Sequence, residues 1–237
     1  MEIKSNFLLI ENKRWVTASI FLALLVILPI FILFFSFFSS GKETLIYLFN
    51  TVLLDYTLNT IYLIFLTSFF ALLFGVFPAW IVSNNTFKGR SFFDIVLYLP
   101  LAIPSYIMGY TYIEILSFTG PIQTYVRYNI PYLSGFFNQD YLQVEVLGII
   151  LGLALYPYVY TASRISFSMI GSNYLNISKN LGLSSTSSFF KVVLPLSRPA
   201  IFSGLFLVIM EFLNEYGAVK YFGVNTYTAG IFRSWNS

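Results

Sequence analysis

Long apolar runs constrain this chain more strongly than any other feature of its sequence. They fall at 17–38, 57–82, 92–115, 144–163 and 199–219. A helix needs about 20 apolar residues to cross a bilayer core ~30 Å thick, and each run reaches that length. Only 10% of the residues are charged, against about 25% in soluble domains. We therefore expect an all-α membrane protein, a polytopic helix bundle with about five spans.

The first run follows two basic residues, Lys13 and Arg14. A cleaved signal peptide has an apolar stretch of about 7–15 residues before a small-residue cleavage site. This run is longer and ends in Phe37-Phe38-Ser39-Ser40, so we interpret it as a retained span, with cleavage as the alternative. Prolines inside the third and fourth runs (Pro100, Pro104 and Pro157) should kink their helices.

The basic residues indicate the orientation of the spans, because cytoplasmic loops carry the excess of Lys and Arg. An N-terminus inside the cell places nine of them in the cytoplasm and four outside. The nine are Lys4, Lys13, Arg14, Lys88, Arg90, Arg164, Lys179, Lys191 and Arg198. The four are Lys42, Arg127, Lys220 and Arg233. We therefore predict a cytoplasmic N-terminus, cytoplasmic connections at 83–91 and 164–198, and an outer connection at 116–143 with a short helix near Gln123–Tyr128.

Several kinds of chemistry are excluded by what the sequence lacks. It has no cysteine and no histidine, which removes disulfides, thiol catalysis and the usual zinc and haem ligands. It has no G-x-x-x-x-G-K-[ST] sequence, the motif that holds nucleotide phosphates. The basic residues are spread along the chain, so the net charge of +3 gives no indication of nucleic-acid binding. We expect a non-enzymatic chain that binds no cofactor or stable metal.

The cytoplasmic connection at 164–198 is long but carries helix signals. Ser172 can cap a helix over 173–181, which Gly182 can end in the left-handed conformation. Ser184 can cap a second short helix through Phe189 and Phe190 to Val193, and Pro195 and Pro199 should close it before the fifth span. This helix-turn-helix could lie on lipid headgroups as an amphipathic hairpin, or it could dock into a groove of a cytoplasmic partner.

The residues of this connection resemble the EAA loop of ABC importer permeases. That motif reads E-A-A, three residues, G, nine residues, I, one residue, L-P. Asn176, Ile177 and Ser178 stand at E-A-A, Gly182 at the glycine, Val192 at the isoleucine, and Leu194 and Pro195 at L-P. The spacing matches throughout, although the E-A-A residues themselves do not. The resemblance makes these residues an ATPase-coupling loop, with Phe189 and Phe190 as apolar anchors for the partner or the bundle.

The resemblance extends over about 56–237. The segments 99–104 and 155–164 look like the corresponding parts of the family, and 210–232 is similar to its iron(III) permease branch. That branch usually carries two permease halves in one chain, so we expect this chain to be a first half, truncated before its last helix. Residues 1–56 would then form an N-terminal tail, the first transmembrane helix and an outer loop, and 57–237 the permease domain.

The family resemblance implies a function and a set of partners. The chain would be the permease subunit of an importer in the bacterial inner membrane, with iron(III) as the leading cargo and thiamine, sulfate or polyamine as alternatives. Its partners would be an ABC ATPase dimer that uses ATP at the cytoplasmic loop, an extracytoplasmic solute-binding protein, a second permease half (fused or separate) and membrane lipid. An ion-gradient-driven transporter and a scaffold without transport are the competing classes.

Acidic residues inside the fifth run are the candidate pathway residues. Glu211 lies near the middle of that run, Glu215 is one turn further on the same face, and Asn214 lies beside them. Acidic side chains at membrane depth usually face a bundle interior or a water-filled cavity. They could line the translocation pathway, where carboxylate and phenol oxygens suit a hard cation such as iron(III), or they could bond within the bundle, for example to Arg164. Asp94, at the inner edge of the third span, is expected to stay solvated.

Overall fold

The computed structural model describes residues 13–39, 46 and 49–235, and within these ranges the chain forms helices and no strands. It divides into two units, residues 1–54 and residues 55–237. The first unit contains α1 (Lys13–Ser39), an apolar helix whose stretch Trp15–Ser36 is long enough to cross a membrane. The expected first span at 17–38 is therefore helical, as predicted.

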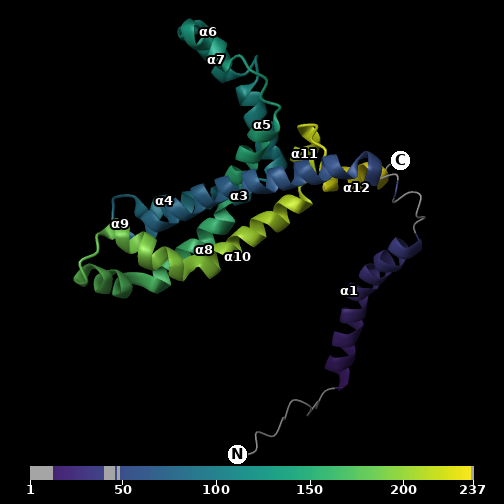
Figure 1. Cartoon of the computed structure of the whole chain (residues 1–237), viewed down its shortest axis with the longest axis horizontal. Helices are drawn as coiled ribbons and strands as arrows, with labels where there is room; N and C mark the ends of the chain where they lie inside the picture. The colour runs from purple at the N-terminus through teal and green to yellow at the C-terminus, as the bar shows by residue number, and fades with distance from the viewer. Residues whose placement is uncertain (1–12, 40–45, 47–48, 236–237) are drawn as a thin grey trace, which may run out of the picture. The chain divides into compact units, whose positions relative to one another are not determined.

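Three long helices organise the second unit: α3 (Leu53–Asn84), α8 (Val144–Asn180) and α10 (Leu194–Asn214). Figure 1 shows α9 at one end of this bundle and α11 and α12 at the other. The shorter elements are α4 (Arg90–Val96), η1 (Leu99–Ala102), α5 (Ser105–Leu116), α6 (Pro121–Asn129), η2 (Pro131–Leu133), α7 (Ser134–Phe137), α9 (Ser185–Ser188), the π-helical η3 (Phe189–Val193), α11 (Gly217–Tyr221) and α12 (Tyr227–Trp235).

Within the described part of the chain, four helices are long and apolar enough to cross a membrane. The number rises to five if two helical segments, Arg90–Ala102 and Ser105–Asn129, together form one span. The expectation of about five spans agrees with this range. The short helix predicted near Gln123–Tyr128 is confirmed as α6.

The third span is not the single kinked helix that the sequence predicted. The two helical segments at this position are bent by 97° relative to each other. Ile103 adopts an extended backbone, with φ −110° and ψ 120°, and Pro104 caps the start of α5. A residue before proline is pushed out of the helical region by the proline ring. The helix is therefore interrupted at Ile103-Pro104, whereas Pro78 of α3 and Pro157 of α8 lie inside unbroken helices.

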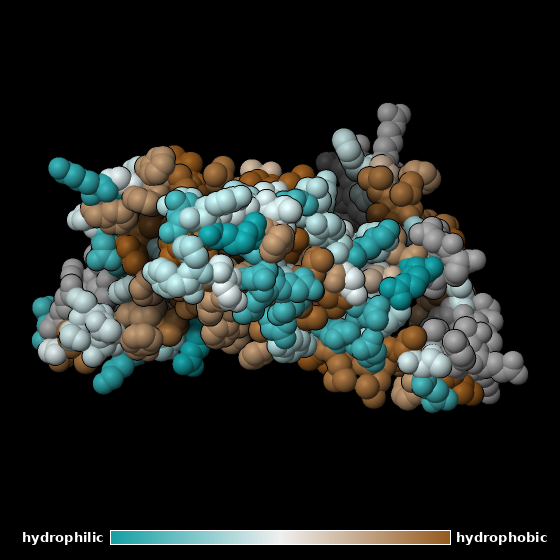
Figure 2. Space-filling model, turned by 90° about the horizontal axis from the view of Figure 1, so that it is seen from above, coloured by the Kyte–Doolittle hydropathy of each residue, from teal (hydrophilic) through white to brown (hydrophobic). Residues whose placement is uncertain are grey.

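The buried side of α3 follows helical spacing. Its buried residues recur every three or four positions: Thr60, Leu63, Thr67, Ala71, Gly75, Ala79 and Val82. Large apolar side chains on other positions, such as Phe65, Phe69 and Phe77, are exposed. Figure 2 shows apolar side chains on one outer face of the molecule, beside hydrophilic ones. One stripe of the helix therefore packs inward, and the rest presents the apolar surface that suits lipid.

Glycines allow the long helices to approach α8 closely. A Cβ added to Gly75 of α3 would lie 2.7 Å from Val159 Cβ, and one added to Gly204 of α10 would lie 2.9 Å from the Tyr158 carbonyl oxygen. Small residues at such crossings let helix backbones pack together where lipid supplies no hydrophobic drive for association. Gly204 is therefore a packing residue between α10 and α8.

Two predicted helix ends are wrong near the connection at 164–198. Helix α8 does not stop at residue 163 and restart after Ser172; it runs without a break to Asn180. Likewise Pro195 and Pro199 do not close a separate helix, because α9, η3 and α10 together form one helical run from Ser185 to Asn214. Pro195 lies in the first turn of α10, where a missing N–H costs nothing. The polar residues after position 163 did not end α8, because its backbone hydrogen bonds continue through them to Asn180.

Candidate functional site: the inter-helix turn, the acidic pocket and the far-end pocket

The turn between α8 and α9 is built as the sequence predicted. Gly182 has φ +86°, and the Leu183 amide donates to the Ser178 carbonyl over 3.0 Å. This hydrogen bond closes a six-residue turn that contains a left-handed glycine, which is the Schellman motif of a helix C-terminus. The Ser184 side chain then accepts a hydrogen bond from the Ser187 amide over 3.2 Å and caps α9. Because both arms continue into long helices, the turn is the shared end of two spans.

Apolar side chains around this turn divide into two groups. Phe189 is buried and packs on Trp80, with ring centroids 4.3 Å apart. Phe190 is 61% exposed, and Ile177 and Leu181 are also exposed. Phe189 therefore anchors the bundle, while the other three expose apolar side chains near the turn, Ile177 and Leu181 before Gly182 and Phe190 after it. We call Ile177, Leu181 and Phe190 the turn surface.

The remaining residues of the predicted coupling loop contribute to its internal packing. The Ser178 hydroxyl donates to the Ser188 hydroxyl over 2.7 Å, and both residues are buried. Val192, Leu194 and Pro195 are half-buried along η3 and α10. Asn176 belongs to α8, but its side chain lies outside the described part of the structure. Ser178 thus joins α8 to α9 through its bond to Ser188, and Val192, Leu194 and Pro195 are partly buried within the bundle.

An ion pair missed by the sequence analysis joins α4 to α8. Arg164 Nε donates to Asp94 Oδ1 over 2.5 Å, and its Nη2 donates to Oδ2. The Tyr160 hydroxyl donates to the same Oδ1 over 2.7 Å. Asp94 is therefore not merely solvated, and Arg164 bonds Asp94, not the acids of α10. The 70 residues that separate the partners give no local signal of the contact.

The three candidate pathway residues have different surroundings. Helix α10 ends at Asn214, so Glu215 does not continue the face of Glu211. Glu215 accepts a hydrogen bond from the Ser105 hydroxyl and another, over 2.8 Å, from the Ala218 amide. The Asn214 amide donates to the Met210 carbonyl of its own helix. The structure thus gives Glu215 and Asn214 bonds that fix the end of α10 and the start of α11.

Glu211 lies in a different setting, because it lines a pocket of about 270 Å³. The pocket is also lined by Tyr106 and Tyr158. Among the residues that the structure describes, the Glu211 carboxylate makes no hydrogen bond or ion pair. Residues that carry carboxylate and phenol oxygens thus line one cavity, and both are ligand types that hard cations prefer. No group of three or more acidic residues in the described ranges could hold a metal ion permanently.

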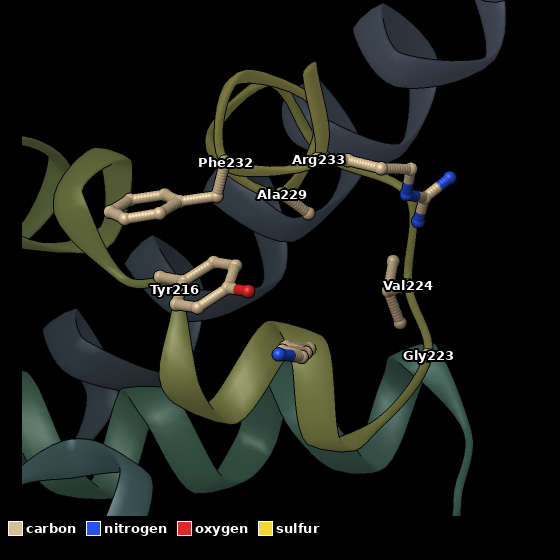
Figure 3. A pocket seen from close by; sticks show the side chains of 7 residues that line it. Tyr216, Gly223, Val224, Ala229, Phe232 and Arg233 are labelled. Atoms are coloured by element: carbon tan, nitrogen blue, oxygen red, sulfur yellow. The ribbon is translucent and has the colours of Figure 1, made fainter. Parts of the chain in front are cut away.

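A further pocket lies at the end of the bundle opposite the turn. It has a volume of about 410 Å³ and is lined by Tyr216, Lys220, Gly223, Val224, Ala229, Phe232 and Arg233. Figure 3 shows the rings of Tyr216 and Phe232 facing one another on one side and Arg233 on another. We call it the far-end pocket. The sequence analysis had assigned its two basic residues only to an outer loop.

Comparison with known proteins identifies the family. Residues 71–233 match the binding-protein-dependent transport system inner membrane component. The chain is 30% identical to the sulfate transport system permease protein CysT of Salmonella typhimurium, over 68% of this chain and 56% of the relative. It is 26% identical to the Fe(3+)-transport system permease protein FbpB 2 of Haemophilus influenzae, over 75% of this chain and 31% of the relative.

A third relative is the molybdenum transport system permease protein ModB of Haemophilus influenzae, 30% identical over 64% of this chain and 63% of the relative. The chain thus spans between about a third and two thirds of the length of these relatives. They carry three different cargo names, so the iron(III) branch is one of several that the chain resembles. The helix bundle and the family match agree, and the chain belongs to the family of binding-protein-dependent transport system inner membrane components.

Proposed function

We propose that this chain is the permease subunit of an ATP-driven, binding-protein-dependent importer. An ABC ATPase dimer would dock at the α8–α9 turn, and a solute-binding protein would deliver cargo at the opposite end. The observation that carries the proposal is the continuity of α8 and of the Ser185–Asn214 run with the turn. Movement imposed at Gly182 would be transmitted along both helices into their membrane-embedded parts.

The turn surface supports this docking role. Ile177, Leu181 and Phe190 are 56%, 78% and 61% exposed. Exposed apolar side chains grouped at one position commonly mark an interface. An ion-gradient-driven transporter would need no such surface at the end of two rigid helices. An ATPase docked at the turn would make that end of the bundle cytoplasmic. If the bent pair Arg90–Ala102 and Ser105–Asn129 forms one span, the N-terminus would lie on the same side, in agreement with the distribution of basic residues.

Single-cysteine labelling tests the docking site and the orientation together. The chain has no cysteine, so Leu181→Cys and Tyr132→Cys each introduce one thiol. Tyr132, in the 116–143 connection, is 84% exposed and serves as the matched control. We expect an impermeant maleimide to label Tyr132→Cys in intact cells and Leu181→Cys only after lysis. The ATPase should protect Leu181→Cys alone. Labelling of Leu181→Cys from outside would overturn the proposal.

For the cargo, we propose iron(III) as the first candidate. The support is the Glu211 carboxylate, which has no partner among the described residues and shares its pocket with Tyr106 and Tyr158. A carboxylate attracts a cation and repels sulfate or molybdate. The contact must be weak, because an ion that binds tightly would not leave. The names of the sulfate and molybdenum relatives make a tetrahedral oxyanion the second candidate.

Uptake by the assembled importer distinguishes these cargoes. Radioactive iron(III), sulfate and molybdate should be offered separately to vesicles that contain the full complex. With iron(III) as cargo, Glu211→Gln should lower uptake several-fold while assembly with the ATPase stays normal. Met210→Gln, at the neighbouring exposed position, is the matched control. Uptake of an oxyanion alone, unaffected by Glu211→Gln, would reject iron(III) and the pathway role of Glu211.

A further inference from the structure

The far-end pocket brings two cations to one cavity. Lys220 lies on the last turn of α11 and Arg233 on the last turn of α12, and both line the pocket. Gly223, with φ +69°, turns the chain between these helices, and its amide donates to the Lys220 carbonyl over 3.1 Å. This tight turn reverses the chain direction after α11. The sequence between the two basic residues therefore folds around the cavity that they share.

Neither cation is neutralised by a direct ion pair. Among the described residues, no carboxylate lies within ion-pair distance of Lys220 or Arg233. Arg233 Nη2 donates to the Asn225 side-chain oxygen over 3.1 Å, and Asn225 in turn donates to Asp55 over 3.2 Å. The Lys220 ammonium lies 5.2 Å from the centre of the Tyr216 ring. Arg233 is thus linked to Asp55 only through the Asn225 amide, and neither cation has a direct carboxylate partner among the described residues.

The helix that carries Arg233 is fixed to α3. The Tyr227 amide donates to the Thr60 hydroxyl over 3.2 Å, and Arg233 Nη1 lies 3.4 Å from the Tyr56 hydroxyl. A Cβ added to Gly230 would lie 2.3 Å from Tyr56 Cε2, so α12 and α3 are in close contact. Arg233 is therefore held in place before any ligand arrives. A cation held in place binds an anion with less loss of side-chain entropy than a freely rotating one.

The cavity also has an apolar wall and spare volume. The rings of Tyr216 and Phe232 stack with centroids 4.2 Å apart, as Figure 3 shows. A liquid water occupies about 30 Å³, so the pocket of about 410 Å³ is larger than a bare tetrahedral ion needs. Tyr221 and Ile231 nearby in sequence are exposed. The site thus offers two positive charges for an anionic head and an apolar flank for what is attached to it.

From this arrangement we infer that Lys220 and Arg233 form a binding site for a phosphate group at the end of the bundle opposite the turn. The group could belong to an anionic lipid headgroup or to free phosphate, and the recognition chemistry is the same for both. Guanidinium and ammonium groups are the usual partners of phosphate oxygens. The site shares no lining residue with the Glu211 pocket, so the inference goes beyond transport and does not depend on the cargo.

Binding measurements on the purified full complex test the inference. Equilibrium dialysis with radioactive inorganic phosphate reports the free anion, and native mass spectrometry after addition of phosphatidylglycerol reports retained lipid. We expect Lys220→Gln with Arg233→Gln to lower the affinity for at least one probe about tenfold or more. Lys220→Arg should keep it. Arg127→Gln is the matched control, because Arg127 also lies over a ring, 4.1 Å from the Phe118 centroid, but outside this pocket.

Each outcome decides the question. Loss of phosphate binding supports a free anion, and loss of retained phosphatidylglycerol with little phosphate binding supports a lipid headgroup. If the double variant does not assemble, Lys220→Gln alone decides, because this exposed side chain makes no hydrogen bond among the described residues. Unchanged binding of both probes overturns the inference. The inference is also overturned if the double variant binds both probes normally and loses only its affinity for an acidic solute-binding protein. Transport of the cargo is a separate readout, so failure of the proposed function would be recognised independently.

Discussion

Replacing Gly182 by valine tests whether the turn between α8 and α9 transmits force. Gly182 has φ +86°, and a Cβ added there would meet no atom within 4 Å. The cost of a side chain is therefore purely conformational. The left-handed conformation costs an ordinary residue about 1–2 kcal/mol, and a β-branched residue is a stronger outlier there. Since 1.4 kcal/mol is a factor of about ten, the native turn should lose roughly five- to thirty-fold in population.

The assay is the ratio of cargo moved to ATP hydrolysed by the reconstituted importer. We expect Gly182→Val to lower this ratio several-fold while hydrolysis continues. Gly182→Asn should stay close to the wild type, because asparagine enters the left-handed region at low cost. Gly135→Ala is the control for loss of a glycine, since that position is also open but lacks a positive φ. Wild-type coupling in Gly182→Val would refute the assigned role of the turn.

Three stability predictions can be checked by thermal unfolding of the purified complex in detergent. Asp94→Asn should cost about 1–2 kcal/mol, less than a fully buried pair, because the Asp94 and Arg164 side chains keep 24% and 25% exposure. Gly204→Ala should cost about 1–3 kcal/mol, because its Cβ would meet backbone atoms of α8 at 2.9 Å. Glu215→Ala should cost about 1–3 kcal/mol, because the Ser105 hydroxyl and the Ala218 amide both lose their acceptor. Melting temperatures equal to that of the wild type would contradict each assignment.

The sequence was most informative where a local signal has one physical meaning. The run lengths predicted the spans, and the glycine and serine at 182 and 184 predicted the turn and the cap that the structure contains. These features depend on residues a few positions apart. A glycine that ends a helix and a serine that caps the next one act through backbone bonds of their own neighbourhood.

The errors arose where helix continuity depends on more than local signals. Ser172 was a suitable cap, but a serine caps a helix only where the backbone leaves the helical region, and α8 continues past it. Ile103-Pro104 was expected to bend a helix and instead turned the chain through 97°. The contact between Asp94 and Arg164 joins distant residues. No pattern within a few residues could have predicted that pair, or the pocket that Lys220 and Arg233 both line.

The unbroken length of α8 has a mechanical consequence. Its 37 residues span ~55 Å at about 1.5 Å per residue, well beyond the ~30 Å of a bilayer core. Such a rod acts as a lever arm, with the Asp94–Arg164 pair as a point of attachment along it. A tilt of about 10° would carry its tip through about 10 Å relative to the other end. A small change in the tilt of α8 would thereby move its end near Gly182 by a distance comparable to the width of a helix.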